Sequence, residues 1–195
     1  MNYPSIDRLA ELQQFIADFA KVKRAIHLSD NGLPENDVEH SFGLAMTCWY
    51  LHEKIAPELN LEKIFKYALS HDVVEVHAGD TYVFDKQAVA TKDKRERDAM
   101  EQLKQEWEDF TDLTEFTEGY ADKRSDEAKF VYAVDKMLPL IIIELHDAKR
   151  IWDDKRVTLE MERQNKKTML TSEIIAPYYE KILVWLDERG NIQKN

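Results

Sequence analysis

Apolar residues that recur every three or four positions are the feature that most constrains how this chain can fold. In the N-terminal segment, from Ser5 to about His27, these residues are Ile6, Leu9, Leu12, Phe15, Ile16 and Phe19. This spacing places them on one face of an α-helix. No convincing run of β-branched residues alternates with a period of two, so the pattern predicts an all-α fold.

The same spacing and the capping residues predict further helices along the chain. Asn36, with Glu39 three positions later, is typical of a capping box that opens a second helix. Pro139 is expected to kink one helix, Pro177 to break the last helical segment, and Gly190 to stop it. The segments predicted after the first helix are Asn36 to Ile55, Leu61 to about Glu75, Thr91 to about Trp107, Ser125 to about His146, and Thr158 to about Glu188.

The length of the chain indicates a single domain. A chain of 195 residues can enclose one full core and is too short for two ordinary domains. Hydrophobic residues make up 44% and charged residues 33%, while Gly and Pro number only five each. This composition is typical of an ordered helical protein rather than a disordered tail. We therefore expect residues 1–195 to form one domain.

The formal net charge of -11 restricts the partners of the protein. Because its average field repels polyanions, the protein would need a concentrated basic stripe to bind along a nucleic acid, and the sequence contains none. A small anionic substrate remains compatible with this charge, since a bound cation reverses the local sign. We expect no long nucleic acid as a partner.

Three further features indicate a cytoplasmic protein. The single cysteine, Cys48, cannot form an internal disulfide and fits a reducing compartment. The N-terminal segment lacks the basic-then-apolar order of a secretory signal. The most apolar run, residues 137–143, is far too short to cross a membrane. We therefore expect a cytoplasmic location and no membrane partner.

The segment ALSHDVVEVHAGD places polar groups in an otherwise apolar stretch. His71, Asp72 and Glu75 lie there, and helical spacing puts His71 and Glu75 on one face beside the core. Burying such groups without partners would cost free energy. A metal ion removes that cost because it satisfies imidazole nitrogen and carboxylate oxygen together.

Two distant residues strengthen the metal hypothesis. His40 lies in the first turn or so of the second predicted helix, and Asp135 lies among apolar residues of a later one. An acid on an apolar helix face needs a compensating charge, which a shared cation supplies. For Asp135, a salt bridge with Lys136 or Lys129 is the alternative. Two His and two Asp would leave open positions on a divalent ion, as catalysis requires.

In their order, H, then HD, then D, these residues resemble the HD superfamily of metal-dependent phosphohydrolases. The segments EHSFGLAM, HDVVEVHAGD and AVDKMLP look most like the small single-domain HD proteins that include 5'-deoxynucleotidases. The resemblance covers about residues 24–139, with flanking helices at 158–189. It implies a helical bundle of about six to eight helices.

The resemblance also implies roles for individual residues. Metal ligands would be His40, His71, Asp72 and Asp135. Glu75 and Asp80 would lie beside the metal, and either of them would position or deprotonate the attacking water. Arg24 would grip the substrate phosphate, which suits its guanidinium fork. In the nucleotidases a tryptophan follows that arginine, whereas this chain has Ala25.

The expected activity is release of phosphate from a nucleoside or deoxynucleoside 5'-monophosphate. One divalent cation is expected, and its ligands do not distinguish Mn, Co, Fe, Ni, Zn and Mg. One alternative is an alarmone pyrophosphohydrolase, although the ED pair typical of that group is absent after the HD pair. Another is a noncatalytic nucleotide-binding regulator that retains the metal pocket. A second metal and a homodimer are left open.

Overall fold

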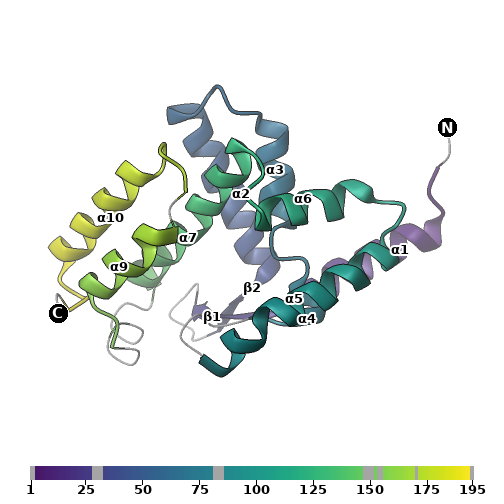
Figure 1. Cartoon of the computed structure of the whole chain (residues 1–195), viewed down its shortest axis with the longest axis horizontal. Helices are drawn as coiled ribbons and strands as arrows, with labels where there is room; N and C mark the ends of the chain where they lie inside the picture. The colour runs from purple at the N-terminus through teal and green to yellow at the C-terminus, as the bar shows by residue number, and fades with distance from the viewer. Residues whose placement is uncertain are drawn as a thin grey trace.

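Helices make up most of the described chain in the computed structural model, and a short strand pair accompanies them (Figure 1). The structure describes residues 3–27, 33–80, 86–146, 152, 156–169 and 171–193. The elements are α1 (Ile6–Phe19), β1 (Lys23–His27), β2 (Pro34–Asn36), α2 (Asp37–Ile55), α3 (Leu61–Ser70), α4 (Glu75–Ala78), α5 (Lys86–Glu106), α6 (Thr111–Ala121), α7 (Asp126–His146), α9 (Leu159–Met169) and α10 (Ala176–Arg189). The prediction of an all-α helical bundle is confirmed.

Three helices, α2, α3 and α7, pack against one another at the centre of the fold. Leu44 and Cys48 of α2, Ile64 and Ala68 of α3, and Val134 of α7 are fully buried in one hydrophobic core. Helix α7 also contacts α6, α9 and α10, which extends this core toward the C-terminus (Figure 1). Burial of these side chains contributes the main stabilisation of the bundle.

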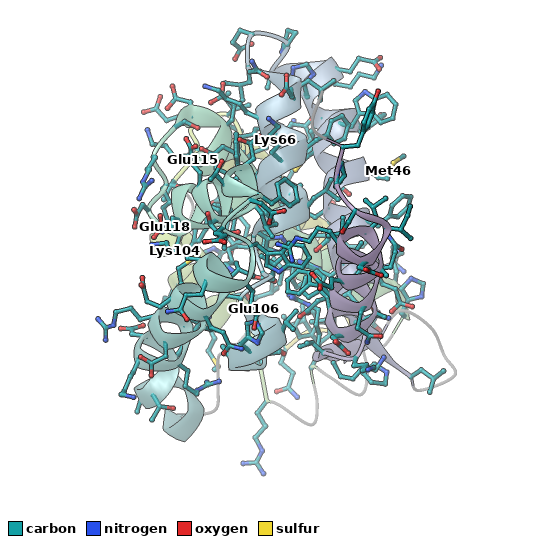
Figure 2. The ribbon with its side chains drawn as sticks, turned by 90° about the vertical axis from the view of Figure 1, so that its right-hand side faces the viewer. Met46, Lys66, Lys104, Glu106, Glu115 and Glu118 are labelled. Atoms are coloured by element: carbon teal, nitrogen blue, oxygen red, sulfur yellow. The ribbon has the colours of Figure 1, made fainter. Side chains whose placement is uncertain are left out.

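A second, smaller core lies under α1, α4 and α5. Its buried members are Phe19, Val73, Val74, Ala99, Leu103 and Trp107. Arg8 of α1 lies over the Trp107 ring, 4.0 Å from its centroid. On the surface beside this core, Lys104 of α5 forms an ion pair with Glu118 of α6 at 2.6 Å (Figure 2). These contacts join α1 to the end of α5, and α5 to α6.

The start of α2 is held by the predicted capping box. The Asn36 side chain accepts hydrogen bonds from the backbone amides of Val38 and Glu39, and the Glu39 carboxylate accepts one from the Asn36 amide. This prediction is confirmed. The box fixes the first turn of α2, and His40 in that turn is fully buried.

The first helix is shorter than predicted. Helix α1 ends at Phe19, and Lys23–His27 form strand β1, which pairs antiparallel with β2. The prediction of a helix to about His27 is therefore wrong in its last part. The spacing of apolar residues indicates only which structure a segment favours by itself. Strand β1 forms because its backbone pairs with residues 34–36, which this spacing does not reveal.

The third helix also ends earlier than predicted, at Ser70. Residues 71–74 form turns, and the short helix α4 begins at Glu75. The two β-branched residues Val73 and Val74 are buried in the smaller core, which favours this break over a continuous helix. His71 is consequently the C-cap residue of α3.

Other boundaries differ in smaller ways. Helix α6 was not predicted, although Leu113, Phe116 and Tyr120 recur at helical spacing. Helix α5 begins at Lys86 rather than Thr91. Helix α7 continues through Pro139, and the kink there stays a prediction.

Near the C-terminus, the predicted break and stop are confirmed. Pro177 lies in the first turn of α10, and Gly190 caps that helix in the left-handed conformation with φ 72°.

Among the described residues, no helix is long and apolar enough to span a bilayer.

Candidate metal centre

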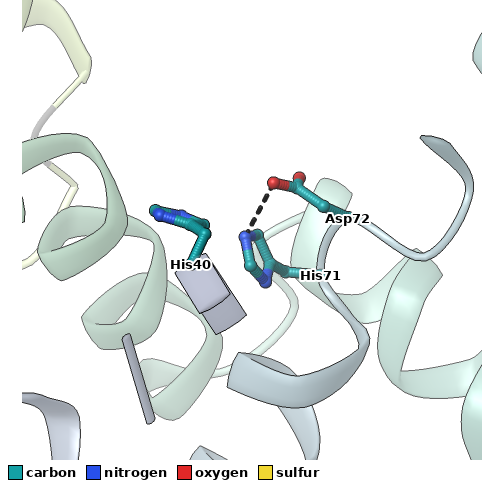
Figure 3. Close-up of side chains that lie close together, drawn as sticks. All are labelled: His40, His71 and Asp72. Atoms are coloured by element: carbon teal, nitrogen blue, oxygen red, sulfur yellow. Dashed lines mark ion pairs between the residues drawn. The ribbon is translucent and has the colours of Figure 1, made fainter. Parts of the chain in front are cut away.

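Residues from the start of α2 and from the turn after α3 meet at one buried point (Figure 3). One ligand atom from each of His40, His71 and Asp72 lies within 4.8 Å of the other two. Both histidines are buried, with His40 fully enclosed. The contact between α2 and α3 therefore brings together residues that are some thirty positions apart in sequence.

The orientation of the His71 ring is set by the backbone. Its Nδ1 atom donates a hydrogen bond to the carbonyl of Ala68 at 2.9 Å. A neutral ring bonded in this way carries its lone pair on Nε2. That Nε2 atom lies 2.9 Å from Oδ2 of Asp72, yet it makes no hydrogen bond. A buried acceptor nitrogen beside a carboxylate is an arrangement suited to a cation.

Asp135 approaches the same point from α7. Its Oδ1 atom lies 2.9 Å from Nε2 of His40 and 4.0 Å from Nε2 of His71. Its Oδ2 atom accepts a hydrogen bond from Tyr120 at 2.5 Å and pairs with Lys136 at 2.8 Å. The salt bridge with Lys136 that was the alternative for Asp135 is thus present, alongside contacts to both histidines.

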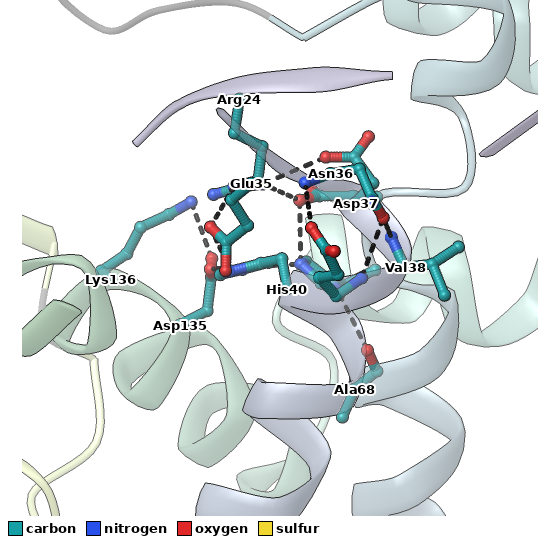
Figure 4. Close-up of polar contacts among 12 residues, drawn as sticks. Arg24, Glu35, Asn36, Asp37, Val38, His40, Ala68, Asp135 and Lys136 are labelled. Atoms are coloured by element: carbon teal, nitrogen blue, oxygen red, sulfur yellow. Dashed lines mark hydrogen bonds and ion pairs between the residues drawn. The ribbon is translucent and has the colours of Figure 1, made fainter. Parts of the chain in front are cut away.

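Arg24 projects from β1 into a group of carboxylates (Figure 4). Its Nη1 atom lies 2.9 Å from Oδ2 of Asp72 and 3.5 Å from Oδ1 of Asp37, and its Nε atom lies 3.3 Å from Oε2 of Glu35. Burial alone would lower the pKa of Arg24, but these carboxylates and Asp135 raise it above its usual range. The guanidinium is therefore a fixed positive charge next to the histidine cluster.

Several buried residues of this cluster were not predicted from the sequence. Glu35 lies 3.5 Å from Nδ1 of His40, and Asp37 is fully buried beside Arg24. Tyr120 comes from the unpredicted helix α6. The segment PENDVEH did signal an excess of acids, but in sequence these acids are indistinguishable from ordinary residues of a helix start.

Glu75 is the first residue of α4, and Asp80 lies just after the end of that helix. Glu75 begins this helix, is 6% exposed, and has a carboxylate oxygen within 4.8 Å of oxygens from Asp37 and Asp72. Asp80 follows Gly79, whose φ of 72° turns the chain after α4. Asp80 interacts electrostatically with both Glu75 and Asp37.

Burial and mutual repulsion shift the protonation of these acids. Burial, followed by the charge of Asp72, raises the pKa of Glu75 to about 10 and that of Asp37 to about 7. Burial would also raise the pKa of Asp135, but Lys136 and His40 hold it well below its usual range. Contacts with Asp135 and Glu35 raise the pKa of His40 to about 9, against the effect of burial.

The donor set fits a divalent cation. It combines two imidazole rings with carboxylates, a mixture suited to several transition metals. Oxygens of Asp37 and Glu75, and Nε2 of His71, are buried without a hydrogen-bond partner, and a cation would satisfy such groups.

Comparison with known proteins identifies the family. The sequence model described as HD domain matches residues 17–176. The chain belongs to the HD domain family. The matched range contains the whole cluster, from Arg24 on β1 to Asp135 on α7.

Relatives of this HD domain include 5'-deoxynucleotidase HDDC2 from several vertebrates. The mouse protein (Mus musculus) is 32% identical over 105 residues, which are 53% of this chain and 51% of the relative. The zebrafish protein (Danio rerio) is 26% identical over 145 residues, 73% of this chain and 70% of the relative. The chain thus matches about half the length of the mouse relative.

Solved structures share the fold of this HD domain. One, described as a predicted metal-dependent phosphohydrolase from Magnetospirillum magnetotacticum MS-1, gives a TM-score of 0.77 at 24% identity and covers 95% of this chain and 98% of its own. A conserved hypothetical protein from Pyrococcus furiosus gives a TM-score of 0.63 at 21% identity and covers 92% of this chain and 99% of its own. Both likenesses span nearly the full described fold.

Proposed function

We propose that this protein is a metal-dependent phosphohydrolase that releases phosphate from a nucleoside or deoxynucleoside 5'-monophosphate. The observation that carries the proposal is the buried cluster of His40, His71 and Asp72, with the Arg24 guanidinium 2.9 Å from Asp72. It combines a set of metal ligands with a fixed positive charge for phosphate. The relatives named 5'-deoxynucleotidase support the substrate class.

In this proposal His40, His71, Asp72 and Asp135 hold one divalent cation. When bound, that cation would supply Lewis-acid stabilisation of phosphate oxygens and a lowered pKa for a coordinated water. A hydrogen bond from Tyr120 and an ion pair with Lys136 hold the Asp135 carboxylate in place. The bond from His71 to the Ala68 carbonyl keeps the His71 Nε2 lone pair directed at the cluster.

The remaining polar residues act on the substrate and on protons. Arg24, held by Glu35, Asp37 and Asp72, would bind the phosphate and stabilise its developing negative charge. Glu75 or Asp80 would accept the proton of the attacking water. A carboxylate near the water lowers the barrier because the nucleophile gains negative character as the proton leaves.

Three further proposals concern the molecule as a whole. Residues 1–195 would form one HD domain, with flanking helices after residue 158. A cytoplasmic location is supported by Cys48, which is a buried free thiol. A homodimer remains a proposal, and the large apolar side chains exposed on α2, such as Phe42 and Tyr50, are compatible with it.

A substrate panel tests the proposed activity. Release of phosphate or pyrophosphate would be measured for nucleoside and deoxynucleoside mono-, di- and triphosphates and for a guanosine alarmone, with Mn, Co, Ni, Zn or Mg added in turn, and with a chelator. We expect hydrolysis of monophosphates that the chelator abolishes. Release of pyrophosphate from a guanosine alarmone, with inert monophosphates, would favour the alternative enzyme. Nucleotide binding without turnover under every condition would favour the noncatalytic regulator.

A further inference from the structure

Glu35 is a buried acid that belongs neither to the predicted metal ligands nor to the predicted catalytic residues. It is the middle residue of β2, and it is 1% exposed. Its backbone is fixed by the next residue, because Asn36 pairs with Lys23 of β1 and also opens the capping box of α2. A buried carboxylate costs free energy unless polar groups surround it, so the groups around Glu35 indicate its role.

One oxygen atom of Glu35 faces two nitrogen atoms of the candidate site (Figure 4). Its Oε2 atom lies 3.5 Å from Nδ1 of His40 and 3.3 Å from Nε of Arg24. All three atoms are buried, and none of them makes a hydrogen bond to a described residue. A carboxylate oxygen can accept two hydrogen bonds. Both would form if the two distances shortened by roughly half an ångström or less, as polar contacts in an active site do when a ligand binds.

For His40, the contact with Glu35 determines which ring nitrogen is available to a cation. The other nitrogen, Nε2, lies 2.9 Å from Oδ1 of Asp135, on the side of the histidine cluster. A cation bound to Nε2 takes the place of a proton there, so the remaining ring proton lies on Nδ1, where Glu35 accepts it. His71 has a similar arrangement, since its Nδ1 atom donates to the Ala68 carbonyl. Each histidine is then oriented through Nδ1 and presents Nε2 to the cation.

For Arg24, the contact with Glu35 fixes the guanidinium group at the nitrogen nearest the backbone. Its Nε atom faces Glu35, whereas its Nη1 atom lies 2.9 Å from Oδ2 of Asp72 and 3.5 Å from Oδ1 of Asp37. A planar guanidinium that is held at two of its nitrogen atoms has one orientation. A fixed orientation favours paired hydrogen bonds to the oxygens of a phosphate group.

We propose that Glu35 is a positioning residue that orients both the metal ligand His40 and the phosphate-binding Arg24 through a single oxygen atom. This inference rests on the proposed function, because His40 and Arg24 have these roles only if a cation and a phosphate bind there. The role requires a charged acceptor at that atom. Glu35→Gln has nearly the same shape, but its one remaining oxygen is neutral and accepts hydrogen bonds more weakly.

Zinc binding to the full chain tests the role of Glu35 toward His40 without measuring activity. Zn²⁺ is the probe because it is diamagnetic, so nuclear magnetic resonance can detect the ring protons of isotope-labelled histidines. In the zinc-bound unaltered chain we expect a slowly exchanging proton on Nδ1 of His40. In Glu35→Gln this proton should exchange faster with water, and the affinity for Zn²⁺ should fall by roughly tenfold to a hundredfold.

Methylphosphonate, a stable substitute for a phosphate group, tests the role of Glu35 toward Arg24. Its binding would be measured by calorimetry at a Zn²⁺ concentration that fills the metal site of both proteins. A weaker metal site then cannot by itself reduce the affinity for methylphosphonate. We expect Glu35→Gln to bind methylphosphonate roughly tenfold more weakly than the unaltered chain, as for the loss of a hydrogen bond to a charged group.

Glu39→Gln is the matched control. It removes the same charge from an exposed residue four positions later, and glutamine at that position still completes the capping box. The affinities for Zn²⁺ and methylphosphonate and the exchange of the His40 proton should all equal those of the unaltered chain. A purely structural role for Glu35 would lower the free energy of unfolding in Glu35→Gln and leave these three measurements unchanged.

The outcomes separate this inference from the proposed function. In a folded Glu35→Gln protein, an unchanged affinity for Zn²⁺, an unchanged exchange of the His40 proton or an unchanged affinity for methylphosphonate would each overturn the inference. The phosphohydrolase proposal would stand in all three cases. If Glu35→Gln does not fold, Glu35→Asp serves with the same expectations, because its shorter side chain keeps the charge but withdraws it from both nitrogen atoms. An unaltered chain that binds no Zn²⁺ would contradict both proposals.

Discussion

His40 and Asp135 are 95 positions apart, and the Nε2 atom of the histidine lies 2.9 Å from Oδ1 of the aspartate. The contact joins the first turn of α2 to the middle of α7, two helices that pack directly in the central core. Both side chains are almost completely buried. Packing of the apolar faces of the two helices therefore places an imidazole and a carboxylate where one cation could bind both.

Tyr120 supports this pair from α6, and its removal should weaken both folding and metal binding. Tyr120→Phe loses the 2.5 Å hydrogen bond to Oδ2 of Asp135. We expect the free energy of unfolding to fall by about 2 kcal/mol, as for a buried hydrogen bond to a charged group. Metal affinity should fall by roughly tenfold. Chemical denaturation and metal titration would measure the two effects, with Tyr132→Phe as the control. An unchanged metal affinity would contradict the role given to Tyr120.

Arg24→Lys should impair substrate binding more than folding. Lysine keeps the positive charge among Glu35, Asp37 and Asp72 but cannot reproduce the guanidinium fork that contacts them. We expect kcat/KM for a nucleoside monophosphate to fall by roughly tenfold to a hundredfold, with KM rising. Steady-state kinetics would measure this change. A KM equal to that of the unaltered chain would show that Arg24 does not bind the phosphate.

The metal-free protein should lose stability as the pH rises. Burial and Asp72 raise the pKa of folded Glu75 to about 10, whereas an unfolded glutamate titrates at about 4.3. The folded state therefore holds this proton more tightly than the unfolded state. The free energy of unfolding consequently declines as the pH rises from about 4 to about 10. Burial raises the pKa of Asp37 to about 7, so its contribution declines between about 4 and 7.

Denaturant unfolding in the presence of a chelator, at several pH values, would measure this dependence. The Glu75→Gln variant should show a shallower decline than the unaltered chain, because its amide does not titrate. Glu58→Gln, at an exposed position, should leave the decline unchanged. Stability that increased between about pH 6 and pH 9 in the metal-free chain would contradict the assignment.

Glu144 joins the C-terminal segment to α7 and should matter for stability rather than catalysis. Its buried carboxylate accepts hydrogen bonds from Arg189 at 2.7 Å, Asn191 at 2.6 Å and Trp152 at 3.2 Å. Glu144→Ala leaves these donors without their partner, and we expect a loss of about 3 kcal/mol in unfolding free energy. Because none of these residues belongs to the metal cluster, kcat/KM of the folded variant should be unchanged. Thermal denaturation and kinetics below the midpoint would separate the two effects.

Much of the fold could be predicted because it depends on residues that are close together in the sequence. The capping box of Asn36 and Glu39, the stop at Gly190 and the apolar stripes of the main helices depend on neighbouring residues, so they were predictable. Strand β1 depends on pairing with residues 34–36 and was missed for that reason. The early end of α3 at Ser70 likewise follows from the packing of Val73 and Val74 against α1 and α5 residues.

The candidate site likewise contains residues that could be predicted from the sequence and residues that could not. His71 and Asp72 stand out because they interrupt an apolar segment, and His40 and Asp135 because each needs a buried partner. Glu35 and Asp37 do not stand out, since acids are common at a helix start. Only the contact of β1 and α2 with the turn after α3 turns them into neighbours of Arg24 and Asp72. Tyr120 was not predicted as a site residue because the helix that carries it, α6, was not predicted.

The most direct test of the account is phosphate release by an Asp72→Ala variant. Asp72 lies between His71 and Arg24 and is a candidate metal ligand together with His40 and His71. With a panel of nucleoside monophosphates and added divalent metal, we expect activity to fall by more than about a hundredfold, while circular dichroism shows nearly unchanged helical content. A folded Asp72→Ala protein with full activity would contradict the proposal that this cluster is the catalytic metal centre.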